Sequence, residues 1–78
     1  MASAAYILVS VGAGHAKEIL ETIRALPGVR QAHTCWGQPD IFAFCEVSDD
    51  HELADVVLDR IHELDGVRST ETHVVVEM

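Results

Sequence analysis

The stretch Leu26-Pro27-Gly28-Val29-Arg30 (LPGVR) decides the fold, because the chain repeats it 38 residues later as Leu64-Asp65-Gly66-Val67-Arg68 (LDGVR). Each copy follows a run with helical spacing and places a glycine where a residue in the left-handed conformation closes a helix. Each copy also leads into a β-prone run. The repeat therefore indicates two copies of one helix–turn–strand unit.

The runs before the two copies are amphipathic. The first has an apolar stripe at helical spacing, formed by Ala16, Ile19, Leu20, Ile23 and Leu26. The second has a similar stripe, formed by Leu53, Val57, Ile61 and Leu64. Asp49 and Glu52 stand at the N-cap and N3 positions of the second helix, which predicts a capping box.

Four β-prone runs surround these helices, at residues 5–11, 29–36, 41–47 and 68–76. The order β-α-β-β-α-β predicts an α+β fold, the ferredoxin-like sandwich with an antiparallel sheet in the order 4-1-3-2 and both helices on one face. We expect residues 1–78 to form a single domain, with residues 1–4 as a loose N-terminal extension.

The first and third strands are apolar on both sides of the pleat, whereas a strand with one wet face should alternate. The helices cover only one face of the sheet, so the other face must carry exposed apolar side chains. We expect a second copy to cover it, since closed two-fold dimers are the commonest oligomers. The predicted dimer interface consists of Tyr6, Leu8, Phe42 and Phe44.

The amino-acid composition excludes several classes of binding partner and indicates the cellular compartment. The chain has 78 residues, with 5 Lys and Arg against 13 Asp and Glu, and a formal charge of -8. This charge repels phosphate backbones, so we expect no direct nucleic-acid binding. No run approaches the roughly 20 apolar residues that span a bilayer. The two cysteines suit a reducing compartment, which favours a cytoplasmic protein.

Several residues suggest chemistry, but simpler structural roles explain them. Gly12 and Gly14 lack the further residues of a dinucleotide or phosphate-binding loop, so they indicate a strand-to-helix turn and no cofactor is expected. His33 and Cys35 share a strand face, but two ligands do not make a zinc site, so no metal is expected. A small packed sheet normally buries a cysteine as an inert apolar residue, which argues against Cys35 as a nucleophile.

The segment Gly37-Gln38-Pro39-Asp40 joins the second and third strands. Its glycine permits a positive φ, its proline fixes φ, and its aspartate can bond nearby backbone amides. If residues 37–40 close the hairpin, Cys35 lies opposite Phe42 and Cys45 opposite Ala32, which predicts no disulfide. Unpaired N–H groups and one carboxylate at the sheet edge would suit the two ends of an amino acid.

Taken in order, these features resemble the ligand-binding domain of the Lrp/AsnC family of transcription regulators. The resemblance rests on the apolar first strand, the two helix ends LPGV and LDGV, the GxxD hairpin of Gly37 and Asp40, and the TxTxVVV pattern of the last strand. It covers nearly the whole chain. Family regulators carry a helix-turn-helix domain before this module, and this chain resembles the stand-alone form without it.

The resemblance implies a dimer of facing sheets that assembles into a ring, with an octamer favoured, and an amino acid effector bound between dimers near the GxxD loop. The implied effector residues are Trp36, Gly37, Gln38, Pro39 and Asp40, together with Thr70 and Thr72 on the last strand. The family usually has a small hydroxyl residue at position 36, so Trp36 either fills the pocket or stacks on a different ligand.

Three functions are consistent with the sequence. The first is a non-enzymatic, oligomeric sensor of an amino acid that modulates transcription indirectly, for example by co-assembling with a full-length Lrp/AsnC regulator. The second is a small dimeric α+β-barrel enzyme with His33 or His73 as general base, which requires an enclosed apolar cavity within each protomer. The third is an assembly module whose effector site is lost behind Trp36.

Overall fold

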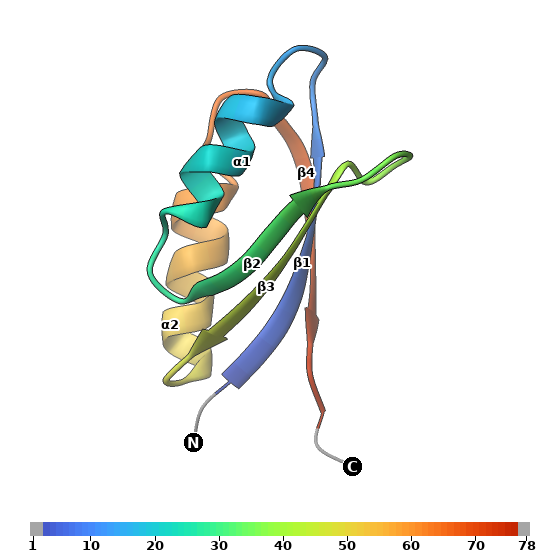
Figure 1. Ribbon diagram of the computed structural model, residues 1–78. Coiled ribbons are helices and arrows are strands. Elements are labelled where there is room, and N and C mark those ends of the chain that lie inside the picture. The colour runs from blue at the N-terminus through green and yellow to red at the C-terminus, as the bar shows by residue number, and fades with distance from the viewer. Residues whose placement is uncertain (1–2, 77–78) are drawn as a thin grey trace.

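The computed structural model describes residues 3–76, apart from the side chains of residues 56–58. Its elements are β1 (Ser3–Val11), α1 (Ala16–Arg24), β2 (Val29–Thr34), β3 (Ile41–Val47), α2 (Asp50–Ala54), the π-helix η1 (Asp55–Ile61) and β4 (Val67–Val74). The strands pair antiparallel in the order β2-β3-β1-β4, and the helices lie on one face of the sheet (Figure 1). The predicted β-α-β-β-α-β order and the 4-1-3-2 sheet are confirmed.

Alternation along the central strands builds the core. Every second residue of β1 and β3 faces the helices and is buried, including Ile7 and Ile41. Ile19 and Ile23 of α1 pack onto this face with Leu53 and Ile61, as their helical spacing predicted. The side chain of Val57, assigned to the same stripe, lies outside the described residues.

The residues between the buried positions form the open face of the sheet. Tyr6 and Phe42 are 51% and 40% exposed, and Leu8 and Phe44 are half-buried. The rings of Tyr6 and Phe44 lie with their centroids 4.9 Å apart. Because the helices cover the opposite face (Figure 1), the predicted apolar patch exists, and it consists of the four residues named from the sequence.

The two copies of the repeated motif form the same turn. Gly28 and Gly66 have φ angles of +90° and +96°, as expected for the residues that close the helices. The valine that follows each glycine donates its N–H to the leucine carbonyl three residues earlier, at 3.3 and 3.1 Å. Each glycine carbonyl accepts a backbone N–H from another segment, Gly28 from Glu46 at 2.8 Å and Gly66 from Gly12 at 2.7 Å. The motif therefore ends each helix and ties that end to the sheet.

The second helix begins as predicted but differs beyond its first turn. Asp49 accepts the N–H of Glu52 at 2.8 Å, which confirms the N-cap. The returning carboxylate of Glu52 accepts the N–H of Ser48 at 3.1 Å, so the box closes one residue earlier than predicted. After Ala54 the helix continues with π geometry, which the helical spacing alone does not distinguish from α geometry.

The first strand is longer than predicted. β1 begins at Ser3, which pairs with Val47, and the Ser3 hydroxyl donates to Asp50 Oδ1 at 2.5 Å. The expected loose extension over residues 1–4 is therefore wrong for residues 3 and 4, and residues 1 and 2 lie outside the described part. Pairing with β3 orders these two residues.

The β2–β3 hairpin has a different register from the predicted one. Cys35 donates its N–H to the Asp40 carbonyl at 2.6 Å, and His33 lies opposite Phe42. The loop thus starts one residue earlier, at residues 36–39, and the prediction that Cys35 faces Phe42 is wrong. An irregularity between residues 29 and 31 places Cys45 opposite Val29, not Ala32. Both thiols are free.

Candidate functional site

The hairpin loop, residues 36–39, projects from the sheet beyond the ends of β2 and β3 (Figure 1). An open pocket of about 440 Å³ lies at this loop. Six residues line it: Thr34, Cys35, Trp36, Gly37, Gln38 and Asp40. The pocket is therefore made almost entirely by one turn of the chain and the strand ends that hold it.

Asp40 is anchored through both of its backbone polar groups. Its backbone N–H donates to the Val9 carbonyl of β1 at 3.0 Å, and its carbonyl accepts the N–H of Cys35. Its side-chain oxygen Oδ1 is buried and makes no hydrogen bond to any described residue. The expectation that this carboxylate bonds nearby backbone amides is therefore not met for Oδ1. A buried oxygen without a donor is costly, so a donor that reached this carboxylate from the pocket would relieve that cost.

The loop backbone offers donors next to this acceptor. Gly37 has a φ angle of +104°, as the turn prediction required, and a Cβ placed there would find open space within 4 Å. Among the hydrogen bonds of the described residues, none is donated by the backbone N–H groups of Gly37 or Gln38. The Gln38–Pro39 peptide bond is cis. Gly37 and Gln38 both line the pocket that Asp40 borders, and their N–H groups have no acceptor among the described residues.

Trp36 lies at the rim of the pocket. Its side chain is fully exposed, at 104% of the reference area, and it lines the pocket without filling it. The two roles considered for this tryptophan, filling of the site and stacking on a ligand, both concern a site between dimers and stay predictions.

Most of the predicted effector residues come together here. Trp36, Gly37, Gln38 and Asp40 all line the pocket, whereas Pro39 does not. Thr70 and Thr72 lie on β4, with β1 and β3 between them and the β2 end of the loop. Their predicted role concerns a contact between dimers and stays a prediction.

Two lining residues, Thr34 and Cys35, were not predicted from the sequence. Cys35 was expected to be buried, but it is exposed because β2 ends at Thr34 and the loop turns away from the sheet. The small hydroxyl side chain of Thr34, directly before the loop, was the available signal. Cys45, in contrast, is buried, and burial raises the pKa of its thiol.

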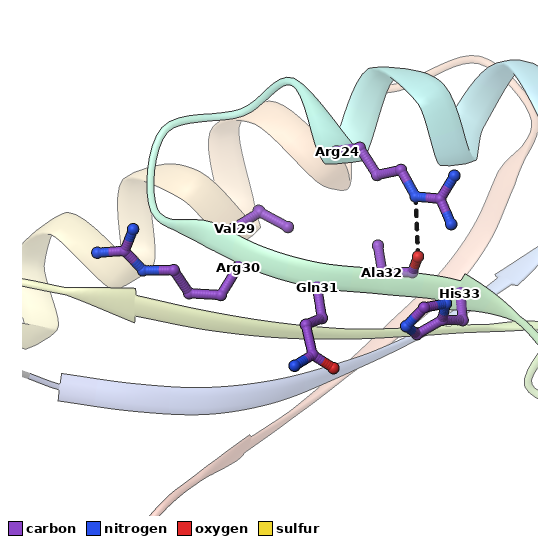
Figure 2. Close-up of a pocket in the computed structure, with 6 residues that line it drawn as sticks. All are labelled: Arg24, Val29, Arg30, Gln31, Ala32 and His33. Carbon is purple, nitrogen blue, oxygen red and sulfur yellow. Dashed lines mark hydrogen bonds between the residues drawn. The ribbon is translucent and has the colours of Figure 1, made fainter.

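A second hollow of about 280 Å³ lies between α1 and β2 (Figure 2). Arg24 reaches from α1 and donates its Nε–H to the Ala32 carbonyl at 2.9 Å, which covers part of the backbone of this edge strand. Gln31 and His33 extend from β2 away from α1. Because this arginine occupies an outward carbonyl, it opposes the addition of a further strand to this edge.

The two histidines proposed as general bases lie on opposite edge strands, His33 on β2 and His73 on β4. His73 Nε2 lies 2.9 Å from Glu71 Oε2 on an exposed surface. Within the described part of the chain, no group of three or more His, Cys, Asp and Glu side chains could hold a metal ion. No helix there is long and apolar enough to cross a bilayer.

Comparison with known proteins agrees with this arrangement. The family model of the Lrp/AsnC ligand-binding domain matches residues 4–78. The chain belongs to the Lrp/AsnC family. Uncharacterised HTH-type transcriptional regulators of Pyrococcus abyssi and Pyrococcus horikoshii are each 31% identical to it over 71 residues, which are 91% of this chain. The chain spans about half the length of these relatives, 45% in both cases.

Solved structures show the same Lrp/AsnC fold. A protein of Thermus thermophilus superposes with a TM-score of 0.92 at 30% identity, and the match covers 97% of this chain and 95% of that protein. Escherichia coli AsnC has a TM-score of 0.88 at 23% identity over 97% of this chain and 52% of its own. A Neisseria meningitidis transcriptional regulator, solved as a complex with L-Met, has a TM-score of 0.86 at 21% identity over 96% of this chain and 50% of its own.

Proposed function

We propose that this Lrp/AsnC-family chain is a non-enzymatic, oligomeric sensor that binds an amino acid at the hairpin loop and modulates transcription indirectly. The observation that carries the proposal is the unpaired, buried Oδ1 of Asp40 beside a pocket of about 440 Å³. An ammonium group bound in the pocket would give the Asp40 carboxylate a donor, in a charge-assisted hydrogen bond. The free N–H groups of Gly37 and Gln38 would receive the carboxylate of the same ligand.

The comparisons support this class of ligand. The family model that matches the chain describes a ligand-binding domain. The Neisseria meningitidis regulator, which shares the fold, was solved with L-Met. The formal charge of -8 repels nucleic acid, so an effect on transcription would pass through another protein, such as a full-length regulator of the same family.

The open face of the sheet supports a homodimer. Tyr6, Leu8, Phe42 and Phe44 form one apolar patch on the side of the sheet opposite the helices. Contiguous exposed apolar patches mark interaction surfaces, and a two-fold axis would bring two identical patches together. In this proposal the dimers assemble further into a ring, with an octamer favoured, and the ligand binds where dimers meet. A ligand that prefers one oligomeric state then populates that state.

The proposed binding is tested by a thermal-shift screen against the twenty amino acids. A ligand at about 100 times its dissociation constant adds about 2.7 kcal/mol to the free energy of unfolding, which shifts the midpoint by roughly 10 °C or more in a domain of this size. We expect stabilisation by one or a few amino acids, lost in Asp40→Asn and kept in Asp59→Asn, which removes an equally charged, exposed residue elsewhere. Flat responses to all twenty would contradict the sensor and favour an assembly module.

The proposed dimer is tested by measuring mass in solution. Phe42→Asp places a charge within the apolar patch, so we expect a lower mass in sedimentation and light-scattering experiments. Ala13→Asp adds the same charge on an exposed turn between β1 and α1 and should leave the mass unchanged. An unchanged mass in Phe42→Asp, with the circular dichroism spectrum retained, would show that the open face is not the interface.

A further inference from the structure

We propose that the hairpin-loop pocket selects ligands with a net positive charge, such as a basic amino acid, and that Trp36 is the residue that makes this selection. The inference rests on the proposed function, because it names the class of ligand for the same site. It comes from the charges that line the pocket and from the position of one indole ring.

The pocket contains a carboxylate and no cationic side chain. Of its six lining residues, Asp40 is the only acid, and none is Lys, Arg or His. A zwitterionic amino acid would place its ammonium group at the Asp40 carboxylate and its own carboxylate on the uncharged N–H groups of Gly37 and Gln38. The lining residues therefore favour positive charge on the ligand and offer no fixed charge to an acidic side chain.

The net charge of the whole chain also favours a positively charged ligand. The formal charge is -8, and a second copy that borders the pocket would bring the same surplus. An excess of one sign raises the local concentration of oppositely charged ligands, and added salt weakens this effect. A cationic ligand therefore gains over a neutral ligand of equal size, and an anionic ligand loses.

Trp36 supplies a second partner for a cation. Its indole is fully exposed and lines the same pocket as Asp40. Tryptophan has the most favourable aromatic face for an ammonium or guanidinium group. The cation–π interaction corresponds to about two- to thirtyfold in affinity, depending on how far water is excluded from it. A ligand with two positive groups would use Asp40 for one and Trp36 for the other.

Gly37 adds no side chain to the pocket between its neighbours Trp36 and Gln38. A Cβ at this position would meet no atom within 4 Å other than those of its chain neighbours, so the pocket is open at this residue. The pocket volume of about 440 Å³ leaves room for a long side chain to extend from Asp40 toward the rim. The combination of a carboxylate, an open pocket and an exposed aromatic ring fits a long cationic side chain better than a short apolar one.

Isothermal titration with four probes tests this inference. L-Lysine and L-norleucine differ mainly in the side-chain ammonium group, cadaverine lacks the carboxylate of lysine, and L-glutamate reverses the side-chain charge. We expect lysine to bind about two- to thirtyfold more tightly than norleucine, with glutamate weakest. Cadaverine should bind more weakly than lysine, because it leaves the N–H groups of the loop unpaired, and the preference for lysine should shrink as salt is added.

Two variants test which residues cause the preference for lysine. Trp36→Leu should reduce the ratio of lysine to norleucine affinity while norleucine binding persists, whereas Asp40→Asn should abolish both. Asp59→Asn, the exposed control, should bind lysine and norleucine with the same affinities as the unchanged chain. Circular dichroism spectra verify that each variant is folded.

The possible failures are distinguishable. If norleucine binds as tightly as lysine, or if Trp36→Leu leaves their ratio unchanged, the selectivity inference is overturned while the proposed sensor stands. If none of the twenty amino acids and none of the four probes binds, the proposed sensor and the inference fall together. If cadaverine binds as tightly as lysine, the site takes amines and the assignment of the loop N–H groups is wrong.

Discussion

Replacement of Gly66 by alanine should destabilise the domain strongly, for two separate reasons. Gly66 has a φ angle of +96°, which a residue with a Cβ rarely adopts. A Cβ at this position would also lie 2.8 Å from Cγ and 2.9 Å from Cβ of His15, and 3.1 Å from Cδ1 of Ile19. The backbone cannot move away freely, because the Gly66 carbonyl accepts the N–H of Gly12 at 2.7 Å.

The two costs can be added. The left-handed conformation costs about 1–2 kcal/mol for a residue with a Cβ, and crowding of a packed site costs about 1–3 kcal/mol. Gly66→Ala should therefore lower the free energy of unfolding by about 2–5 kcal/mol. The whole free energy of unfolding of a domain of this length is about 4–12 kcal/mol. The variant is thus expected to lose a substantial part of the stability of the domain.

Two other glycines separate the backbone cost from the steric cost. Gly14 has a φ angle of +82°, but a Cβ added there would meet no atom within 4 Å, so Gly14→Ala should lose only about 1–2 kcal/mol. Gly12 lacks a positive φ, and its nearest contact would be 3.6 Å, so Gly12→Ala should stay within about 0.5 kcal/mol. Urea unfolding followed by far-ultraviolet circular dichroism measures all three, at one protein concentration because oligomerisation shifts apparent stability.

The order of the three losses in free energy of unfolding separates the backbone contribution from the steric contribution. An equal loss in Gly66→Ala and Gly14→Ala would refute the steric contribution of His15 and Ile19. A neutral Gly14→Ala would refute the backbone contribution, since nothing but the positive φ distinguishes that site from open solvent.

Three further outcomes are expected. Asp49→Ala removes the N-cap acceptor for the N–H of Glu52 and should cost about 1 kcal/mol in the same urea titration; a neutral result would mean that this cap is dispensable. A thiol reagent should modify the exposed Cys35 quickly and the buried Cys45 only on unfolding, so mass spectrometry should show one early adduct, and two early adducts would contradict the burial. Burial raises the pKa of Cys45, so above pH about 8.5 the unfolded chain loses the thiol proton before the folded chain does. The free energy of unfolding should therefore fall as the pH rises above this value, and it should fall less in Cys45→Ala. Equal pH profiles for the variant and the unchanged protein would refute this linkage.

The sequence predicted the elements and the two helix ends because these depend on local properties. Helical spacing predicted α1 and the apolar positions of the second helix, and the repeated glycines marked the left-handed residues at both helix ends. The apolar character of both faces of β1 and β3 predicted an apolar open face that carries some of Tyr6, Leu8, Phe42 and Phe44, while the face that each residue takes came from the structure. Each of these features is encoded within one segment of the chain.

Features that depend on two distant segments were less predictable. The predicted register of the β2–β3 hairpin was wrong, because the sequence does not show that Cys35 pairs with Asp40. The sequence also does not show the irregularity in β2, between residues 29 and 31, that shifts the pairing of Val29. The second helix was expected to be α-helical throughout, but it changes to π geometry after Ala54. The extent of β1 also depended on a partner, since Ser3 is ordered by its pairing with Val47.

The same distinction applies to the candidate site. The sequence by itself determined that a glycine, a carboxylate and a tryptophan would share one short loop. Only the tertiary structure decided that the indole stays at the rim and that one oxygen of Asp40 is buried without a hydrogen-bond donor. The physical reason is that the Asp40 backbone is held by the carbonyl of Val9, on a strand distant in the chain, and this contact places the carboxylate where the described part of the protein offers it no partner.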